Sequence, residues 1–230
     1  MLIVSKLAND LRILLGVIVN CVESIRARVP EDLKTDPAFD DLDGAIDSVF
    51  YINRELLALN EPKGTERGVI DVNELVTQAR GVLERVLGQE IRLSLGLVNS
   101  PPIVQADPVE LEWLLLNLAA NGRDAMPDGG VLTIETSMIE AWLQDSPTSL
   151  PRPHRYLRLT VSDSGPGMSS EVRSRAFEPH FTTTEGAIGL GLTSVAITVR
   201  SLRGWLHLQP NQPYGTQVHV YLPMLGASRR

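Results

Sequence analysis

The first 60 residues carry apolar side chains at alternating steps of three and four positions. This spacing is typical of the contact seam of supercoiling helices. Pro30 and Pro37 interrupt it, so the pattern predicts a helical hairpin over residues 1–60. Because two helices alone bury little surface, we expect two hairpins to pair as a dimeric four-helix bundle. The seam residues are Val4, Leu7, Leu11, Leu14, Ile18, Cys21 and Ile25, then Phe39, Leu42, Ile46, Val49, Ile52, Leu56 and Leu59.

Residues 61–67 are polar and predict a linker, and the pattern over residues 68–225 is mixed. Helices are predicted at 72–87 and 107–126, the second capped by Asp107 with Pro108 just inside. The segment 144–154 is a Pro-rich loop. Because helices and strands do not alternate regularly, we expect an α+β domain in which helices cover one face of a mixed sheet. The predicted strands are 91–97, 131–137, 156–163, 205–210 and 216–222.

Composition narrows the possible partners and locations. The 230 residues are 43% hydrophobic with a formal net charge of -7, so the positive field that attracts nucleic acid is missing. The single cysteine, Cys21, excludes an internal disulfide and fits a reducing compartment. The apolar run 13–19 is far shorter than the roughly 20 residues that span a bilayer, and no signal-peptide pattern precedes it. We expect a cytoplasmic protein without membrane insertion.

Three polar residues share one stripe of the predicted helix 107–126. Asn117, Asn121 and Asp124 stand at i, i+4 and i+7 on an otherwise apolar cylinder. The stripe is either a helix end that faces solvent or a set of ligands. Carboxamide oxygens suit a hard cation such as Mg²⁺, which binds oxygen and keeps phosphates as further ligands.

A carboxylate ends the predicted strand 156–163. By parity Asp163 points to the same face as the apolar Leu157, Leu159 and Val161, so it requires a hydrogen-bond donor. Gly165 and Gly167 follow, and glycine permits close backbone approach. A plain turn would explain this motif, and so would a buried acceptor for the exocyclic amine of a purine.

Glycines also precede the last helical pattern. Gly186, Gly189 and Gly191 lead into it, so backbone N–H groups at a helix start would face an anion there. Such glycines are weak evidence alone. In this order, however, the polar stripe, the Asp–Gly motif and the glycine-rich helix start form a far more specific combination.

Four segments resemble the N, G1, F and G2 boxes of sensor histidine kinases, within the GHKL group of ATP-binding proteins. They are "NLAANGRDAMPDGG", "DSGPGM", "FEPHFTTT" and "GLGL". The hairpin ahead of them looks like the dimerisation and phosphotransfer domain of that family. The "DAMP" and "FEP" variants are most similar to the nitrogen-regulation type and to hybrid kinases. The resemblance implies an α/β sandwich of the GHKL (Bergerat) type over residues 68–225.

The resemblance also implies a nucleotide site for ATP and Mg²⁺. Asn121 matches the Mg²⁺-binding asparagine, with Asn117 one turn earlier, and Asp163 matches the adenine-reading aspartate. Residues 178–188 become a lid over the triphosphate. The implied nucleotide-binding set is Asn117, Asn121, Asp124, Asp163, Gly165, Gly167, Met168, Gly189 and Gly191.

The first helix departs from this family at the phosphoacceptor. The family reads roughly "LAHDFNNLL" and this chain reads "LANDLRILL", so Asn9 stands in place of the histidine. A carboxamide nitrogen is not basic and cannot accept a phosphoryl group as imidazole does. Asp10 retains the neighbouring acid, whereas Ile13 replaces the polar residue that positions water for dephosphorylation of a partner. Asn9 and Asp10 are thus interpreted as a degenerate phosphotransfer site.

The lid departs from the family as well. Thr184 replaces a lysine, the lid is about two residues short, and Ala187 and Ile188 replace Gly and Thr. No Lys or Arg lies between Arg175 and Arg200. Because phosphoryl transfer relies on cations and dipoles that stabilise developing charge, we expect impaired chemistry even where nucleotide still binds.

Four hypotheses follow. The first is a homodimeric pseudo-histidine kinase that regulates a response regulator receiver domain, or another histidine kinase, by binding. The second is an active kinase that phosphorylates a histidine on a partner chain. The third is a kinase inactivated by an engineered replacement of the histidine, but one such change would not also produce Ile13, Thr184 and a short lid. An independent ATPase fits least, because Asn117 stands where such ATPases keep a carboxylate base.

Overall fold

The computed structural model describes residues 67–143, 152–178, 181–183 and 191–225 continuously, together with selected residues between 11 and 49. The chain divides into two units, which are described separately. One comprises residues 1–66 and 169–197, and the other residues 67–168 and 198–230. Asn9, Asp10, Ile13, Thr184, Ala187, Ile188 and Gly189 lie outside the described residues.

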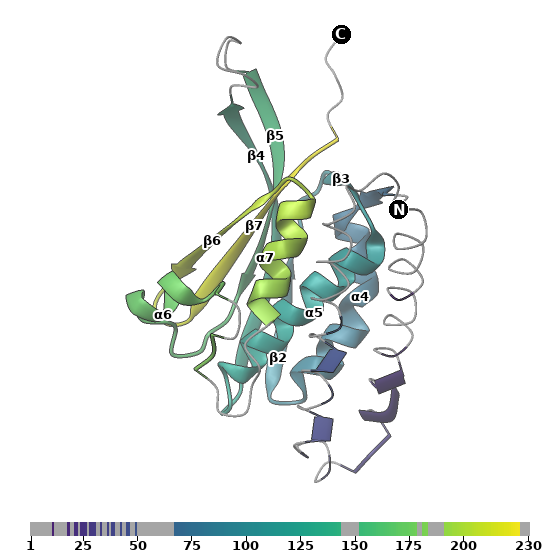
Figure 1. The fold of residues 1–230 in the computed structure, drawn as a ribbon, viewed down its shortest axis with the longest axis vertical. Coiled ribbons are helices and arrows are strands. Elements are labelled where there is room, and N and C mark those ends of the chain that lie inside the picture. Colours follow the sequence, from purple (N-terminus) through teal and green to yellow (C-terminus); the bar gives the residue numbers. More distant parts are fainter. Residues whose placement is uncertain are drawn as a thin grey trace. The chain divides into compact units, whose positions relative to one another are not determined.

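A mixed five-stranded sheet forms the larger unit, in the order β2-β4-β5-β7-β6. β2 (Ile91–Gly96) runs parallel to β4 (Gly130–Leu143), and the other pairs, through β5 (Arg152–Ser162), β7 (Thr216–Pro223) and β6 (Trp205–Pro210), are antiparallel. β4 and β5 extend beyond their neighbours as a long hairpin (Figure 1). The predicted mixed sheet is confirmed.

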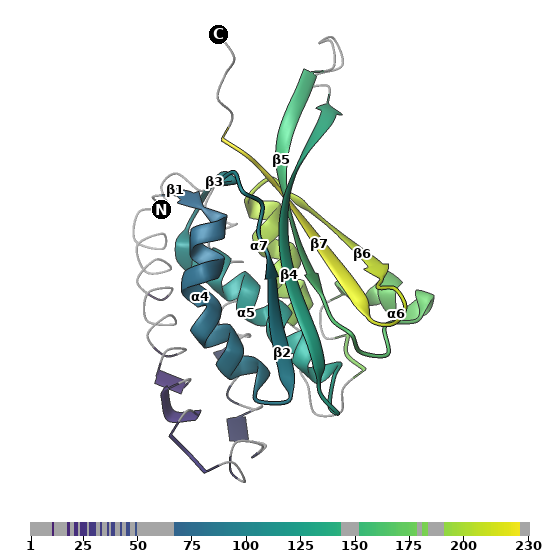
Figure 2. The same cartoon turned by 180° about the vertical axis from the view of Figure 1, so that it is seen from behind.

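Two helices of this unit cover one face of the sheet. α4 (Val72–Leu87) contacts β2, and α5 (Pro108–Asp124) contacts β4 and β5 (Figure 1, Figure 2). Between helices and sheet lies a core of fully buried aliphatic residues, including Leu83, Leu111, Leu115, Leu132, Ile134, Leu157, Leu159 and Leu222. At about 25 cal/mol per Å² of apolar area, this burial is the main stabilising contribution to the unit.

The helix bounds follow from local capping. Asp71 accepts hydrogen bonds from the Asn73 and Glu74 amides, and α4 ends before Gly88, whose φ is 76°. Asp107 caps α5 by accepting from the Val109 amide, with Pro108 in the first turn. These caps satisfy amides that have no partner within the helix. The predicted helix 72–87 is confirmed, and the predicted helix 107–126 ends two residues early.

The structure of this unit differs from the sequence prediction in two places. The predicted loop 144–154 is shorter, because Arg152, Pro153 and His154 already pair with β4. Prolines do not prevent this, since a strand tolerates proline near its start. A second sheet was not predicted: β1 (Gly68–Asp71) pairs antiparallel with β3 (Ile103–Ala106).

The smaller unit includes α6 (Ser170–Arg175) and the first part of α7 (Gly191–Ser201), which continues into the larger unit. Several described residues between 11 and 49 are helical, and Val22 and Ile46 are buried. Among the predicted seam residues, Ile18, Ile25 and Leu42 are 44%, 55% and 37% exposed. The four-helix bundle remains a prediction. No helix in the part of the chain that the structure describes is long and apolar enough to cross a membrane.

A polar triangle joins α4, β4 and the segment after β2. Asn73 Nδ2 donates to the Val98 carbonyl (2.7 Å), and the Thr136 hydroxyl donates to Asn73 Oδ1 (2.7 Å). The Val98 amide in turn donates to the Thr136 hydroxyl (3.0 Å). Thr136 is 5% exposed, so each of its partners would lose a hydrogen bond that water cannot easily replace.

We therefore expect Thr136→Val to lower the free energy of unfolding by about 1–3 kcal/mol, because the Val98 amide and Asn73 Oδ1 both lose a partner. Urea denaturation checks this. Thr133→Val, the same change in the same strand but outside the triangle, is the matched control. Equal stability of the two variants would contradict the assigned role.

Candidate nucleotide site

Asp163 lies directly after β5 and is 8% exposed. Its Oδ1 accepts hydrogen bonds from the Gly165 amide (2.9 Å) and the Thr216 amide (3.1 Å). Both hydrogen bonds are accepted by Oδ1, and neither involves the second carboxylate oxygen, Oδ2. Burial raises the pKa of the Asp163 carboxyl, while the hydrogen bonds from Gly165 and Thr216 oppose that rise. The arrangement fixes a buried acceptor in one orientation.

Glycines allow three backbone segments to meet around this carboxylate. A Cβ at Gly165 would overlap the Ala125 carbonyl at the end of α5, and one at Gly215 would overlap the Asp163 carbonyl. Gly167 has φ 79°, and its Cβ would lie 2.8 Å from the Gly215 carbonyl oxygen. No larger residue fits these positions without moving the backbone. The structure thus brings the α5 end, residues 163–167 and the turn before β7 to one place.

The asparagines of α5 hold their side chains by bonding back to their own helix. Asn117 Nδ2 donates to the Trp113 carbonyl (3.0 Å), and Asn121 Nδ2 donates to the Asn117 carbonyl (2.7 Å). In each carboxamide the nitrogen is therefore used by the helix, and the oxygen is the group left to accept a ligand. The predicted stripe accordingly presents carboxamide oxygens.

Asp124 differs from the two asparagines of the stripe. Its Oδ1 accepts from Arg123 Nε (3.0 Å) and Nη2 (2.8 Å), and its side chain is 40% exposed. Among the described residues, no three His, Cys, Asp or Glu side chains converge to hold a metal ion.

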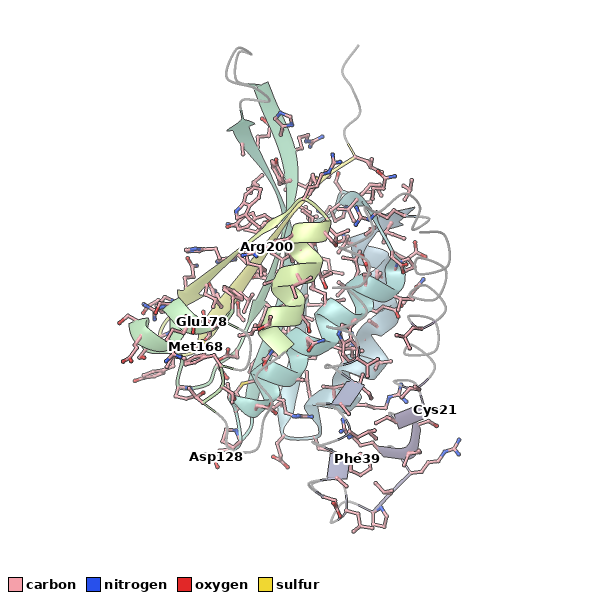
Figure 3. All side chains as sticks on the ribbon, viewed as in Figure 1. Cys21, Phe39, Asp128, Met168, Glu178 and Arg200 are labelled. Atoms are coloured by element: carbon pink, nitrogen blue, oxygen red, sulfur yellow. The ribbon has the colours of Figure 1, made fainter. Side chains whose placement is uncertain are left out.

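The remaining predicted residues fall in both units. Met168, labelled in Figure 3, follows the glycine segment and is partly exposed according to its accessible surface. Gly191 is the first residue of α7, where amides without partners within the helix are expected. Thr193, in the same helix, donates to the Phe177 carbonyl (3.5 Å) within the smaller unit.

Several site residues were missed at the sequence level. Gly215 and Thr216 contact Asp163 although they lie more than 50 positions away. The Ser164 hydroxyl accepts from the Val131 amide (2.9 Å) and so ties the glycine segment to β4. The only sequence signal for these was the glycine preceding the strand 216–222.

Comparisons with known proteins identify the class of domain to which this fold belongs. The family described as "Histidine kinase-, DNA gyrase B-, and HSP90-like ATPase" matches residues 106–226. The chain belongs to this family, and its ATPase domain is homologous to those of two-component sensor kinases. The GHKL resemblance is confirmed at this level, whereas the nitrogen-regulation type stays a prediction.

The individual proteins that are similar to this chain are also sensor kinases. Sensor kinase CckA of Brucella abortus (strain 2308) is 31% identical over 185 residues, which cover 77% of this chain and 19% of CckA. The mycobacterial sensor histidine kinase MprB is 25% identical, with a TM-score of 0.56 over 69% of this chain and 97% of that structure. ShkA, 19% identical, shares the fold with a TM-score of 0.63 over 96% of this chain and 45% of its own. The chain spans less than half the length of the curated relatives that it matches.

The raised pKa of Asp163 predicts how Asp163→Asn affects stability. A carboxyl group whose pKa is raised on folding contributes to stability at pH values below its ordinary pKa of 3.8. This contribution is lost as the pH rises through the pKa of the folded state. Asparagine keeps the Oδ1 acceptor and carries no charge. At pH 7 we therefore expect Asp163→Asn to unfold at a urea concentration equal to or above that of the wild type, with any advantage shrinking toward pH 4.

The control is Asp163→Ala, which leaves the buried Gly165 and Thr216 amides without their acceptor and should cost about 1–3 kcal/mol. Destabilisation of Asp163→Asn at pH 7 to the level of Asp163→Ala would contradict the assignment of Oδ1 as the acceptor of both amides.

Proposed function

We propose that this chain is a pseudo-histidine kinase of two-component signal transduction that binds ATP and regulates a response regulator or a partner kinase by contact. One observation carries the proposal: the chain has Asn9 at the phosphoacceptor position, and its first histidine is His154. The described part of the nucleotide site, by contrast, keeps a buried and oriented carboxylate at Asp163.

Asp163 suits the exocyclic amine of adenine. Its Oδ1 already has two amide donors, so Oδ2 is the oxygen that accepts from a base. Gly165 and Gly167 let the base approach the backbone closely. The solved structure of ShkA is a complex with AMPPNP, which supports nucleotide as the ligand of this fold.

The carboxamide oxygens of Asn121 and Asn117 suit Mg²⁺ only when phosphates complete the coordination. When bound, Mg²⁺ would neutralise phosphate charge, and the two asparagines would orient it. Because neither Asn117 nor Asn121 is a carboxylate, neither can act as the base that activates water. We include Asp124, Met168, Gly189 and Gly191 in the proposed nucleotide site on the family motif alone.

Two departures support a loss of phosphoryl transfer. Asn9 offers no basic nitrogen to attack the γ-phosphate. Thr184, Ala187 and Ile188 replace lid residues of the family, and the sequence from Ala176 to Val199 contains no Lys or Arg. Stabilisation of transferring phosphate depends on such cations, so nucleotide would serve as a ligand rather than a phosphate donor.

The proposed dimer involves residues 1–60, with 61–67 as linker and 68–225 as the ATP-binding domain. The exposed seam residues Ile18, Ile25 and Leu42 support it, because an apolar stripe of this kind is normally covered by a partner helix. A receiver domain is the proposed partner because the relatives are sensor kinases. A second candidate is an active kinase for a histidine on a partner chain, which the buried and oriented Asp163 carboxylate favours.

We expect Asp163→Asn to weaken ATP binding about tenfold or more, because the change places an amide donor opposite the donor amine of adenine. Hydrogen bonds to charged groups contribute about 1.5–3 kcal/mol, and each 1.4 kcal/mol is a factor of ten. Calorimetric titration with ATP and Mg²⁺ measures this. Unchanged affinity in the folded variant would remove Asp163 from the adenine site.

Asn9→His separates the two candidate functions. With labelled ATP we expect no phosphorylation of the wild-type chain, and none of Asn9→His, because the lid is degenerate as well. Denaturing gels with detection of acid-labile phosphate check this. Strong labelling of Asn9→His would overturn the pseudokinase proposal and favour a kinase that acts on another chain.

A further inference from the structure

Asn211 lies in the turn between β6 and β7 and forms three hydrogen bonds. Its amide donates to the Gly215 carbonyl (2.9 Å), which closes the turn. Its Nδ2 donates to the backbone carbonyl of Asp163 (2.9 Å), 48 positions earlier in the sequence. Its Oδ1 accepts from Gln217 Nε2 (3.1 Å). Asn211 therefore connects the turn directly to the residue at the centre of the candidate site.

The hydrogen bonds of Asn211 and its neighbours determine which way each carboxamide group faces. A carbonyl oxygen only accepts, so Asn211 must turn Nδ2 toward Asp163 and Oδ1 toward Gln217. Gln217 consequently donates with Nε2, and its Oε1 accepts from Gln209 Nε2 (2.7 Å). Gln209, Gln217 and Asn211 are all partly buried, and they form a one-way series of donors that ends at the Asp163 carbonyl.

The Asp163 carbonyl belongs to the peptide group that joins Asp163 to Ser164. The next peptide group along the chain joins Ser164 to Gly165, and its amide donates to Asp163 Oδ1. A fixed Asp163–Ser164 peptide therefore anchors the start of the turn that carries the Gly165 amide back to the Asp163 carboxylate. The Asp163 amide donates to the Thr216 carbonyl (3.0 Å). The Asp163 carbonyl, in contrast, is held by the side chain of Asn211.

We propose that Asn211 is a positioning residue that holds the Asp163 carboxylate in the orientation needed to select the 6-amino group of adenine. The inference rests on the proposed nucleotide-binding function. Asn211 itself makes no contact with the base in this proposal. It acts through the Asp163–Ser164 peptide, and Gln217 and Gln209 act through Asn211.

The test compares ATP with purine riboside triphosphate, which carries hydrogen in place of the 6-amino group. Asn211→Asp retains the shape and the acceptor for Gln217 but loses the donor to the Asp163 carbonyl. We expect its affinity for ATP to fall about five- to tenfold, while its affinity for purine riboside triphosphate changes less than twofold. The preference of the wild type for ATP should therefore nearly disappear.

Two further variants complete the experiment. Asn99→Asp makes the same change at an exposed position after β2 and should keep the wild-type preference. Asn211→Ala removes the donor without adding charge, and it carries the test if Asn211→Asp does not fold. Equal losses of affinity for both nucleotides, or an unchanged preference for ATP, would overturn the role of Asn211. Failure of the folded wild type to bind ATP would instead overturn the proposed function.

Discussion

The candidate site depends on one constraint: a buried carboxylate at the end of β5 needs hydrogen-bond donors from within the protein. Asp163 meets this by accepting the Gly165 and Thr216 amides with the same oxygen. Two amides can reach that oxygen only if residues 163–167 and the start of β7 approach within backbone contact. Gly165, Gly167 and Gly215 follow from this requirement, because a Cβ at any of them would overlap or crowd a neighbouring carbonyl.

The sheet supplies the framework for that approach. β5 and β7 are adjacent and antiparallel, so the end of β5 faces the start of β7, where Ser162 pairs with Gln217. α5 packs against β4 and β5. It ends beside the glycine segment, where Gly165 lies against the Ala125 carbonyl. The sheet order therefore places a carboxylate, two carboxamides and a tight glycine turn in one unit, and burial of Asp163 raises its pKa.

The sequence predicted what local chemistry controls. α4 lies between an aspartate cap and a glycine, and β6 occupies its predicted residues, because capping and alternation are short-range signals. Asp163 was predicted because a carboxylate on an apolar strand face is unusual. Thr216 and Asn211 could not be found in this way, since they reach Asp163 across 53 and 48 positions through strand pairing. β1 and β3 were missed because each has only four residues and their mutual pairing joins segments more than 30 positions apart.

The proposed function combines an adenine site at Asp163 with a degenerate phosphotransfer site, and the adenine site is its central claim. A two-dimensional ¹H–¹⁵N NMR titration of the folded chain with ADP tests that claim residue by residue. We predict saturable shifts of the Gly165 and Thr216 amide signals, because both donate to the carboxylate that would bind the base. Saturable shifts elsewhere with these two signals unchanged, or no shifts at millimolar ADP, would contradict it.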